Sequence, residues 1–281
     1  FNPMGSILGM FVASNVILAA LQSEIRNSAG ELIFDTLSFA EKAAIRTHDL
    51  AVIRNPYVAL GLVVIIMIVV FLVAKMPNTR SENPNSTALD SAKRLIKNKL
   101  YRRGVVAQIF YVGVQIMCWT FIIHYAENLG IPKAVAQRYN MVAMAIFISF
   151  RFLSTLLMKY FNSRKLLLFF AIGGMLTITG TIFIQGMGGL YCLVATSAFM
   201  SLMFPTIYGI SLEGIGEDAT LGAAGLVMAI VGGALMPPLQ GMIIDLENVM
   251  GLPAVNFSFV LPFICFIVIA WFANYSIKNK Q

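Results

Sequence analysis

The fold is decided by the stretch Tyr101-Arg-Arg-Gly-Val-Val-Ala-Gln-Ile-Phe-Tyr-Val-Gly-Val-Gln-Ile-Met-Cys-Trp-Thr-Phe-Ile-Ile-His-Tyr-Ala126. It is long and apolar enough to cross a bilayer as a helix, for which about 20 residues suffice. Four polar or aromatic side chains recur in it at spacings of three, four and four, and therefore share one helical face: Gln108, Tyr111, Gln115 and Trp119. An amide that faced lipid would lack hydrogen-bond partners, so this face must contact other protein or a water-filled cavity.

The residues alone leave two interpretations of this face open. Glutamine side chains commonly form hydrogen bonds between neighbouring membrane helices. Two amides flanked by tyrosine and tryptophan also suit a site for a polar ligand, whose apolar groups would lie against the aromatic rings.

The composition indicates a membrane protein with several spans. Of 281 residues, 58% are hydrophobic and 12% are charged, whereas about 25% are charged in a typical soluble domain. The mean hydropathy is +0.80. A net charge of +7 would suggest a nucleic-acid partner in a soluble protein, but here the basic residues lie at the ends of apolar segments, so we expect no nucleic acid. The three cysteines lie in apolar runs and are expected to be buried thiols.

Eight apolar segments are predicted to span the membrane, namely 1–21, 56–74, 101–126, 135–160, 166–185, 190–212, 221–244 and 257–277. Pro205, the Gly232-Gly233 pair and the Pro237-Pro238 pair are expected to kink or interrupt their helices. Between the first two spans, Ser38-Phe-Ala-Glu41 is a capping-box pattern that predicts a short helix in solvent. Between the second and third, residues 87–99 form a basic amphipathic segment, which predicts a helix in the membrane interface.

The distribution of lysine and arginine predicts the orientation. Alternate loops hold thirteen basic residues on one side and six on the other, which places the first group, with the linker 76–101, in the cytoplasm. Two spans precede this basic linker and six follow it. We therefore expect three parts: 1–75 as the last two helices of an N-terminal half, 76–101 as a cytoplasmic linker with an interfacial helix, and 102–281 as a six-helix half.

The usual signatures of an enzyme are missing. The only histidines are His48, in an expected loop, and His124, near a span end, so no metal-ligand cluster and no catalytic motif is visible. No acidic residue lies in the middle of a span, since Glu127, Glu213 and Asp245 all lie at span ends, where solvated caps are expected. The sequence therefore predicts a protein that is not an enzyme and uses no cofactor or metal.

One charge does lie within a span. Asn140, Met144, Phe147 and Arg151 share a helical face, and Arg151 is eight residues from Lys159, which is about 12 Å along a helix. Such an arginine either extends toward the cytoplasm and caps neighbouring carbonyls or has a function. A comparable stripe follows on the sixth expected span, formed by Ser197, Ser201, Phe204 and Tyr208.

Four segments, in order along nearly the whole chain, resemble the fucose permease type of proton-coupled sugar symporter in the major facilitator superfamily. They are Tyr-Val-Gly-Val-Gln-Ile-Met-Cys-Trp (111–119), Arg151-Phe-Leu-Ser-Thr, Ser-Ala-Phe-Met-Ser-Leu-Met-Phe-Pro-Thr-Ile-Tyr (197–208) and Val-Met-Ala-Ile-Val-Gly-Gly-Ala-Leu-Met-Pro-Pro (227–238). The resemblance implies an all-α bundle of twelve membrane helices in two halves, with sugar bound between them. This chain would hold helices five to twelve.

The resemblance also implies roles for single residues. Gln115 and Trp119 would face the sugar from helix seven, and Arg151 would be the arginine of helix eight. The proton-carrying carboxylates of the family lie in the first four helices, outside this chain. Phe204 stands where the family often has tyrosine, which removes a hydroxyl. The loop 159–165 keeps the basic end of the superfamily's cytoplasmic loop motif and lacks its acidic residue.

The resemblance thus predicts secondary active transport of a neutral sugar, L-fucose or a related hexose, with protons by alternating access. The alternatives are a carrier for another hexose, a polyol or a drug, and a membrane sensor on the same fold. The expected partners are sugar, protons, the bilayer and the remaining helices of the carrier, in a multi-pass cell membrane protein (the inner membrane in a Gram-negative bacterium). The predicted sugar-binding residues are Gln115, Trp119, Tyr111, Gln108, Asn140, Arg151, Phe204 and Tyr208.

Overall fold

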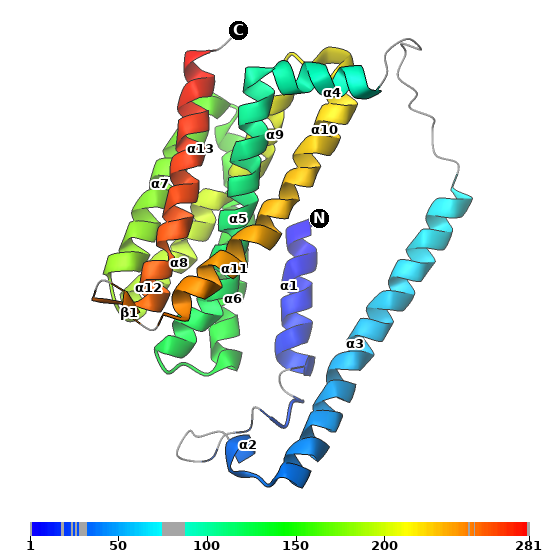
Figure 1. Cartoon of the computed structure of the whole chain (residues 1–281), viewed down its shortest axis with the longest axis vertical. Helices are drawn as coiled ribbons and strands as arrows, with labels where there is room; N and C mark the ends of the chain where they lie inside the picture. The colour runs from blue at the N-terminus through cyan, green and yellow to red at the C-terminus, as the bar shows by residue number, and fades with distance from the viewer. Residues whose placement is uncertain are drawn as a thin grey trace. The chain divides into compact units, whose positions relative to one another are not determined.

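The computed structural model describes residues 2–17, 20–23, 25, 27, 33–74, 88–246, 248–249 and 251–279 (Figure 1). Its contacts divide the chain into two compact units, one formed by Gly5–Glu82 and one by Phe1–Met4 with Asn83–Gln281. Seven helical segments in the described residues are long and apolar enough to cross a membrane. The prediction of an all-α, multi-pass membrane protein is confirmed, whereas the three-part division at 75 and 101 stays a prediction.

The first helix is α1 (Asn2–Val12), which belongs to the smaller unit from Gly5 onward and continues as a π-helix (Ala13–Ile17). The predicted span 1–21 is therefore helical up to Ile17, and residues 18–19 lie outside the described part. A short helix α2 (Ile33–Thr36) precedes the long helix α3 (Phe39–Val73). This first apolar helix is too short to be counted among the seven segments that could span a membrane. The count of eight spans therefore stays a prediction.

Helix α3 starts at the predicted capping box. The backbone N–H and the hydroxyl of Ser38 both donate to Oε2 of Glu41, at 3.0 and 2.6 Å. The expected short helix and the expected span 56–74 prove to be one helix with Pro56 inside it. The residues before Pro56 include good helix formers, which favour continuation of the helix. Pro56 removes a single intrahelical hydrogen bond.

His48 consequently lies within α3 and not in a loop. Its neighbour Asp49 is buried and accepts hydrogen bonds from the backbone N–H groups of Gln22 and Ser23, at 2.9 and 3.0 Å. These two bonds attach the segment that follows the first helix to the side of α3.

The larger unit is a helical bundle that contains the remaining elements. In chain order they are α4 (Ala88–Lys97), α5 (Lys99–Asn128), α6 (Lys133–Leu157), α7 (Ser163–Phe183), α8 (Met187–Met200), α9 (Met203–Leu212), a 3-10 turn (Gly216–Asp218), α10 (Ala219–Met228), a second 3-10 turn (Ala229–Val231), α11 (Gly232–Ile244), the hairpin of β1 (Asn248–Val249) and β2 (Leu252–Pro253), α12 (Ala254–Ser258) and α13 (Val260–Lys278). The hairpin was not predicted. Residues 75–87 of the expected linker lie outside the described residues, and its interfacial helix is α4.

Helix α5, which contains the stretch that decides the fold, packs against α6, α8, α9, α11 and α13. The side chain of Asn98 caps its start by accepting from the backbone N–H groups of Leu100 and Tyr101, at 2.9 and 3.1 Å. Glycines allow close packing along its length: a Cβ at Gly232 of α11 would lie 2.0 Å from the carbonyl oxygen of Ile109. The two backbones are therefore in direct contact.

Two of the predicted spans are broken within the membrane. The sixth is divided between α8 and α9 at Ser201 and Leu202, just before Pro205, as predicted. The seventh is broken by the 3-10 turn Ala229–Val231, which directly precedes Gly232. Pro237 and Pro238 lie inside α11 and do not interrupt it, contrary to expectation. Each removes one N–H donor and crowds the preceding turn, yet the helix continues to Ile244.

Candidate functional site

Aromatic side chains of α5 and α9 form a continuous cluster. The ring of Tyr111 meets the ring of Phe204 edge-on with centroids 6.0 Å apart, and Phe204 stacks on Tyr208 at 6.4 Å. Tyr111 is fully buried and donates its hydroxyl hydrogen bond to the carbonyl of Met200 at 3.1 Å. Tyr111 thus packs against Phe204 from the interior of the bundle. Phe204 and Tyr208 are half-buried, so part of each ring is accessible.

Trp119 joins three helices. Its indole Nε1 donates a hydrogen bond to Oγ of Ser197 on α8 at 3.3 Å. Its ring also meets Phe147 of α6 edge-on, with centroids 5.1 Å apart. Because the indole is half-buried, one part of the ring is fixed by these neighbours and the rest remains accessible. A half-exposed ring held in this way suits stacking against the apolar face of a ligand.

Arg151 lies on α6 beside the break between α8 and α9. One nitrogen of its guanidinium group donates to the backbone carbonyl of Ser201 at 3.3 Å. The hydroxyls of Ser154 and Ser201 are 3.4 Å apart at the same place. The partner that the sequence left unnamed is therefore a helix-end carbonyl, and the arginine is half-buried at that point.

The three amides of the predicted site make no hydrogen bond within the described part of the chain. Gln108 is fully buried, and neither its amide nitrogen nor its oxygen has a partner. The side-chain oxygen of Asn140 is likewise buried and unpaired. Gln115 is half-buried. The structure thus brings Tyr111, Trp119, Arg151, Phe204 and Tyr208 together around the break between α8 and α9, and shows no contact that joins the three amides to them.

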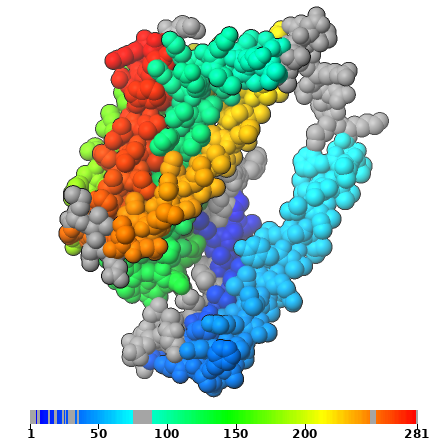
Figure 2. Space-filling view, viewed as in Figure 1, coloured from blue at the N-terminus to red at the C-terminus, as the bar shows by residue number. Residues whose placement is uncertain are grey.

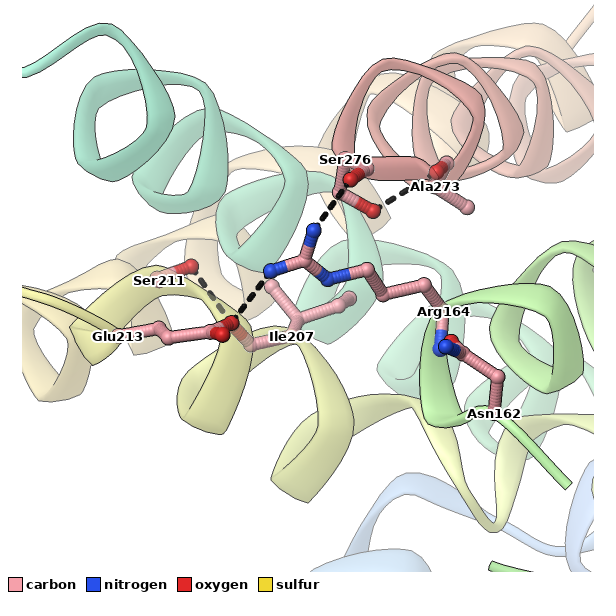
Figure 3. A network of polar contacts seen from close by, with 7 residues as sticks. All are labelled: Asn162, Arg164, Ile207, Ser211, Glu213, Ala273 and Ser276. Carbon is pink, nitrogen blue, oxygen red and sulfur yellow. Dashed lines mark hydrogen bonds and ion pairs between the residues drawn. The ribbon is translucent and has the colours of Figure 1, made fainter. Parts of the chain in front are cut away.

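A polar network lies at the C-terminal end of α9 and was not predicted from the sequence (Figure 3). Arg164, at the start of α7, is buried, forms an ion pair with Glu213 at 2.5 Å and donates to the carbonyl of Ser276 on α13 at 2.6 Å. Glu213 is thus the partner of a buried arginine, not merely a solvated cap. The only sequence signal was the basic loop 159–165, because the two residues are 49 positions apart.

The histidine, cysteine and acidic side chains of the described residues are dispersed. No group of three histidine, cysteine, aspartate or glutamate side chains there could hold a metal ion. Cys118, Cys192 and Cys265 are free thiols, of which Cys192 is only partly buried.

The chain is 64% identical over 271 residues to an L-fucose-proton symporter of Haemophilus influenzae, covering 96% of this chain and 63% of that relative. Along nearly its whole length the chain is therefore similar to carriers of the fucose permease type. It spans 63% and 62% of the length of the two L-fucose-proton symporters that it matches. No family model matches the chain.

Further relatives are less similar in sequence. An L-fucose-proton symporter of Escherichia coli is 28% identical, and the match covers 98% of this chain and 62% of that relative. A putative glucose/galactose transporter of Helicobacter pylori is 27% identical, with coverage of 100% and 65%. A crystal structure of the superfamily transporter FucP in the outward conformation superposes with a TM-score of 0.73 at 27% identity, covering 98% of this chain and 66% of that one.

Proposed function

We propose that the chain is part of a carrier that moves a neutral sugar, with L-fucose as the first candidate, together with protons by alternating access. The observation that carries this proposal is the 64% identity to an L-fucose-proton symporter along 96% of the chain. The half-buried amide of Gln115 and the half-buried rings of Trp119, Phe204 and Tyr208 agree with it. A neutral polyhydroxy ligand needs hydrogen bonds for its hydroxyls and flat apolar surface for its C–H groups.

Each residue of the candidate site has a distinct proposed role. The Gln115 amide donates to and accepts from sugar hydroxyls. The accessible part of Trp119 lies against the sugar ring, with Ser197 and Phe147 fixing its orientation. Phe204 and Tyr208 form a second aromatic wall. Arg151 holds the break between α8 and α9 in place through Ser201.

The coupled proton is proposed to bind outside this chain. Glu213 is paired with Arg164, and Glu127 lies 3.7 Å from both His124 and Lys133. Asp245 caps the end of α11. A proton carrier must be desolvated so that its pKa approaches neutral, and these acids lie at helix ends. The remaining helices of the carrier and the lipid bilayer are therefore proposed as necessary partners.

The alternative substrates are D-glucose and D-galactose, because relatives named as glucose/galactose transporters match almost the whole chain at 27 to 28% identity. Proteoliposomes with a full-length carrier that contains this chain separate the two. We expect added L-fucose to start proton uptake, and glucose and galactose to start little. Proton uptake with the hexoses alone would favour the alternative. Sugar flux without proton movement would contradict symport.

A further inference from the structure

A cavity of about 750 Å³ lies at the end of the larger unit that the lysine and arginine distribution assigns to the cytoplasm. Helix α4 crosses this end, where its atoms contact the tops of α5 and α10 (Figures 1 and 2). Four basic side chains and one acidic one line the cavity, namely Arg94, Lys97, Lys99, Arg164 and Glu213. Its lining therefore has a formal excess of three positive charges.

The two arginines are already paired. Arg94 donates from Nε and from a terminal nitrogen to the two carboxylate oxygens of Asp218, at 2.7 and 2.6 Å. This hydrogen bond raises the pKa of Arg94 further above its ordinary value, so the guanidinium stays charged. Arg164 is paired with Glu213. The positive charge that remains uncompensated in the cavity belongs to the lysines.

Lys97 and Lys99 have no hydrogen bond or ion pair in the described part of the chain, and both are exposed. They lie on either side of Asn98, where α4 ends and α5 begins. A solvated basic end would suffice to explain lysines on a convex surface. Here both side chains line a hollow, which favours a bound anion as their partner.

Neighbouring aromatic residues indicate the height of this cavity in the membrane. The guanidinium of Arg103 lies over the ring of Tyr275 at 3.6 Å and over Trp271 at 4.9 Å. Trp271 is 49% exposed on α13, and Tyr275 also lines the cavity. Tryptophan and tyrosine concentrate at the membrane–water interface. The cavity therefore opens at the level of the lipid headgroups.

Helix α4 supports the same placement. Leu95 is buried against the bundle, while Leu89 and Ile96 are 65% and 63% exposed, although the helix also carries Lys93, Arg94 and Lys97. An amphipathic helix with exposed leucine and isoleucine beside lysines is suited to the headgroup region. A soluble anion would use the lysines but would gain nothing from these apolar side chains or from Trp271.

We propose that this cavity binds the phosphate of an anionic phospholipid headgroup, with Lys97 and Lys99 as its ligands and the acyl chains beside Trp271. Basic pockets between membrane helices on the cytoplasmic side are suited to such headgroups. The proposal does not depend on which solute the carrier transports.

The test is calorimetric titration, in neutral detergent, of a full-length carrier that contains this chain with three probes. These are short-chain phosphatidylglycerol, short-chain phosphatidylcholine and inorganic phosphate. We expect phosphatidylglycerol to bind with one-to-one stoichiometry and the other two to bind far more weakly. In Lys97→Gln/Lys99→Gln, affinity should fall about thirtyfold, since each lysine near a lipid surface contributes about fivefold.

A matched control removes two positive charges from the same end without touching the cavity. In Lys93→Gln/Lys159→Gln, phosphatidylglycerol affinity should stay within about twofold of the unmodified chain. Equal losses in both double variants, or equal binding of the two lipids, would overturn the proposal. Phosphate binding as tight as that of phosphatidylglycerol would assign the cavity to a soluble anion instead. A lowered melting temperature of Lys97→Gln/Lys99→Gln without lipid would show that the lysines are structural and would also overturn it.

Discussion

Arg151 donates a hydrogen bond to the carbonyl of Ser201, the carbonyl that Pro205 leaves without a partner. In an unbroken α-helix, the carbonyl of residue 201 would accept the N–H of residue 205. Proline has no N–H, and α8 ends at Met200. A side chain 50 positions away in the sequence therefore replaces a missing backbone donor within the membrane.

This relationship predicts that Arg151 and Pro205 are coupled. Arg151→Gln should leave a carbonyl unsatisfied, which costs about 1–3 kcal/mol, and should lower the melting temperature in detergent. Arg151→Lys should be intermediate, because it keeps a donor but loses the planar fork. Adding Pro205→Ala to Arg151→Gln should restore part of the loss by returning an N–H to the helix. Pro237→Ala in the same background is the control, and an equal rescue by it would contradict the coupling.

Gln115 is predicted to act on ligand affinity and not on stability. Gln115→Leu should weaken L-fucose binding by about one to two decades, because sugar hydroxyls lose their partners at about 1–3 kcal/mol each. The melting temperature without sugar should stay unchanged, since the half-buried amide makes no hydrogen bond within the described residues. Calorimetry on a full-length carrier containing this chain measures the affinity. Gln137→Leu, on α6, is the matched control and should bind normally.

Gln108 is predicted to behave in the opposite way. Its amide is fully buried without a hydrogen bond, so Gln108→Leu should relieve a desolvation cost of about 1–3 kcal/mol. We expect a higher melting temperature in the absence of sugar. A lower one would show that an ordered water or a ligand normally completes the hydrogen bonds of this amide.

The contact between α5 and α11 provides a packing test. Gly232→Ala would place a methyl group 2.0 Å from the carbonyl oxygen of Ile109, so the helices must separate, at a cost of about 1–3 kcal/mol. Gly241→Ala lies in the same helix with nothing within 4 Å of the new methyl group. It should be neutral or slightly stabilising. Melting curves that rank the two variants the other way would refute the contact.

The orientation is tested by cysteine labelling in intact cells, in a full-length carrier whose native cysteines are replaced. The lysine and arginine distribution predicts that Lys159→Cys faces the cytoplasm and Arg138→Cys faces outward. An impermeant maleimide should label Arg138→Cys readily and Lys159→Cys only after the membrane is permeabilised. The reverse pattern would invert every assignment of sides, including that of the basic cavity.

The helices of the larger unit were predictable because each shows one dominant signal. Apolar length located α5, α6, α7 and α13 to within a few residues, and the basic amphipathic pattern located α4. The capping box at Ser38 was also found correctly, but the continuation of α3 through Pro56 was not. Proline weakens a helix without always ending it, and its outcome depends on the residues on both sides.

The site was harder to predict because its contacts cross between helices. Periodicity placed Tyr111 and Trp119 on one face, yet it could not show that Tyr111 is sealed behind Phe204 or that Trp119 bonds Ser197. The ion pair of Arg164 and Glu213 could not be predicted for the same reason. Sequence spacing carries no information on contacts between distant helices. The roles of the sugar-binding residues stay predictions.

The central position of α5 has a consequence for the order of biosynthesis. This helix is made first among the spans of the larger unit, but α11 and α13, which cover two of its sides, are made last. Gly104, near its start, lies against Ser211 and Phe272, more than a hundred positions later. The amides of Gln108 and Gln115 must therefore remain in the translocon or the bilayer without their final surroundings until nearly the whole chain has been synthesised. Closure of this bundle is consequently a late, post-insertion event.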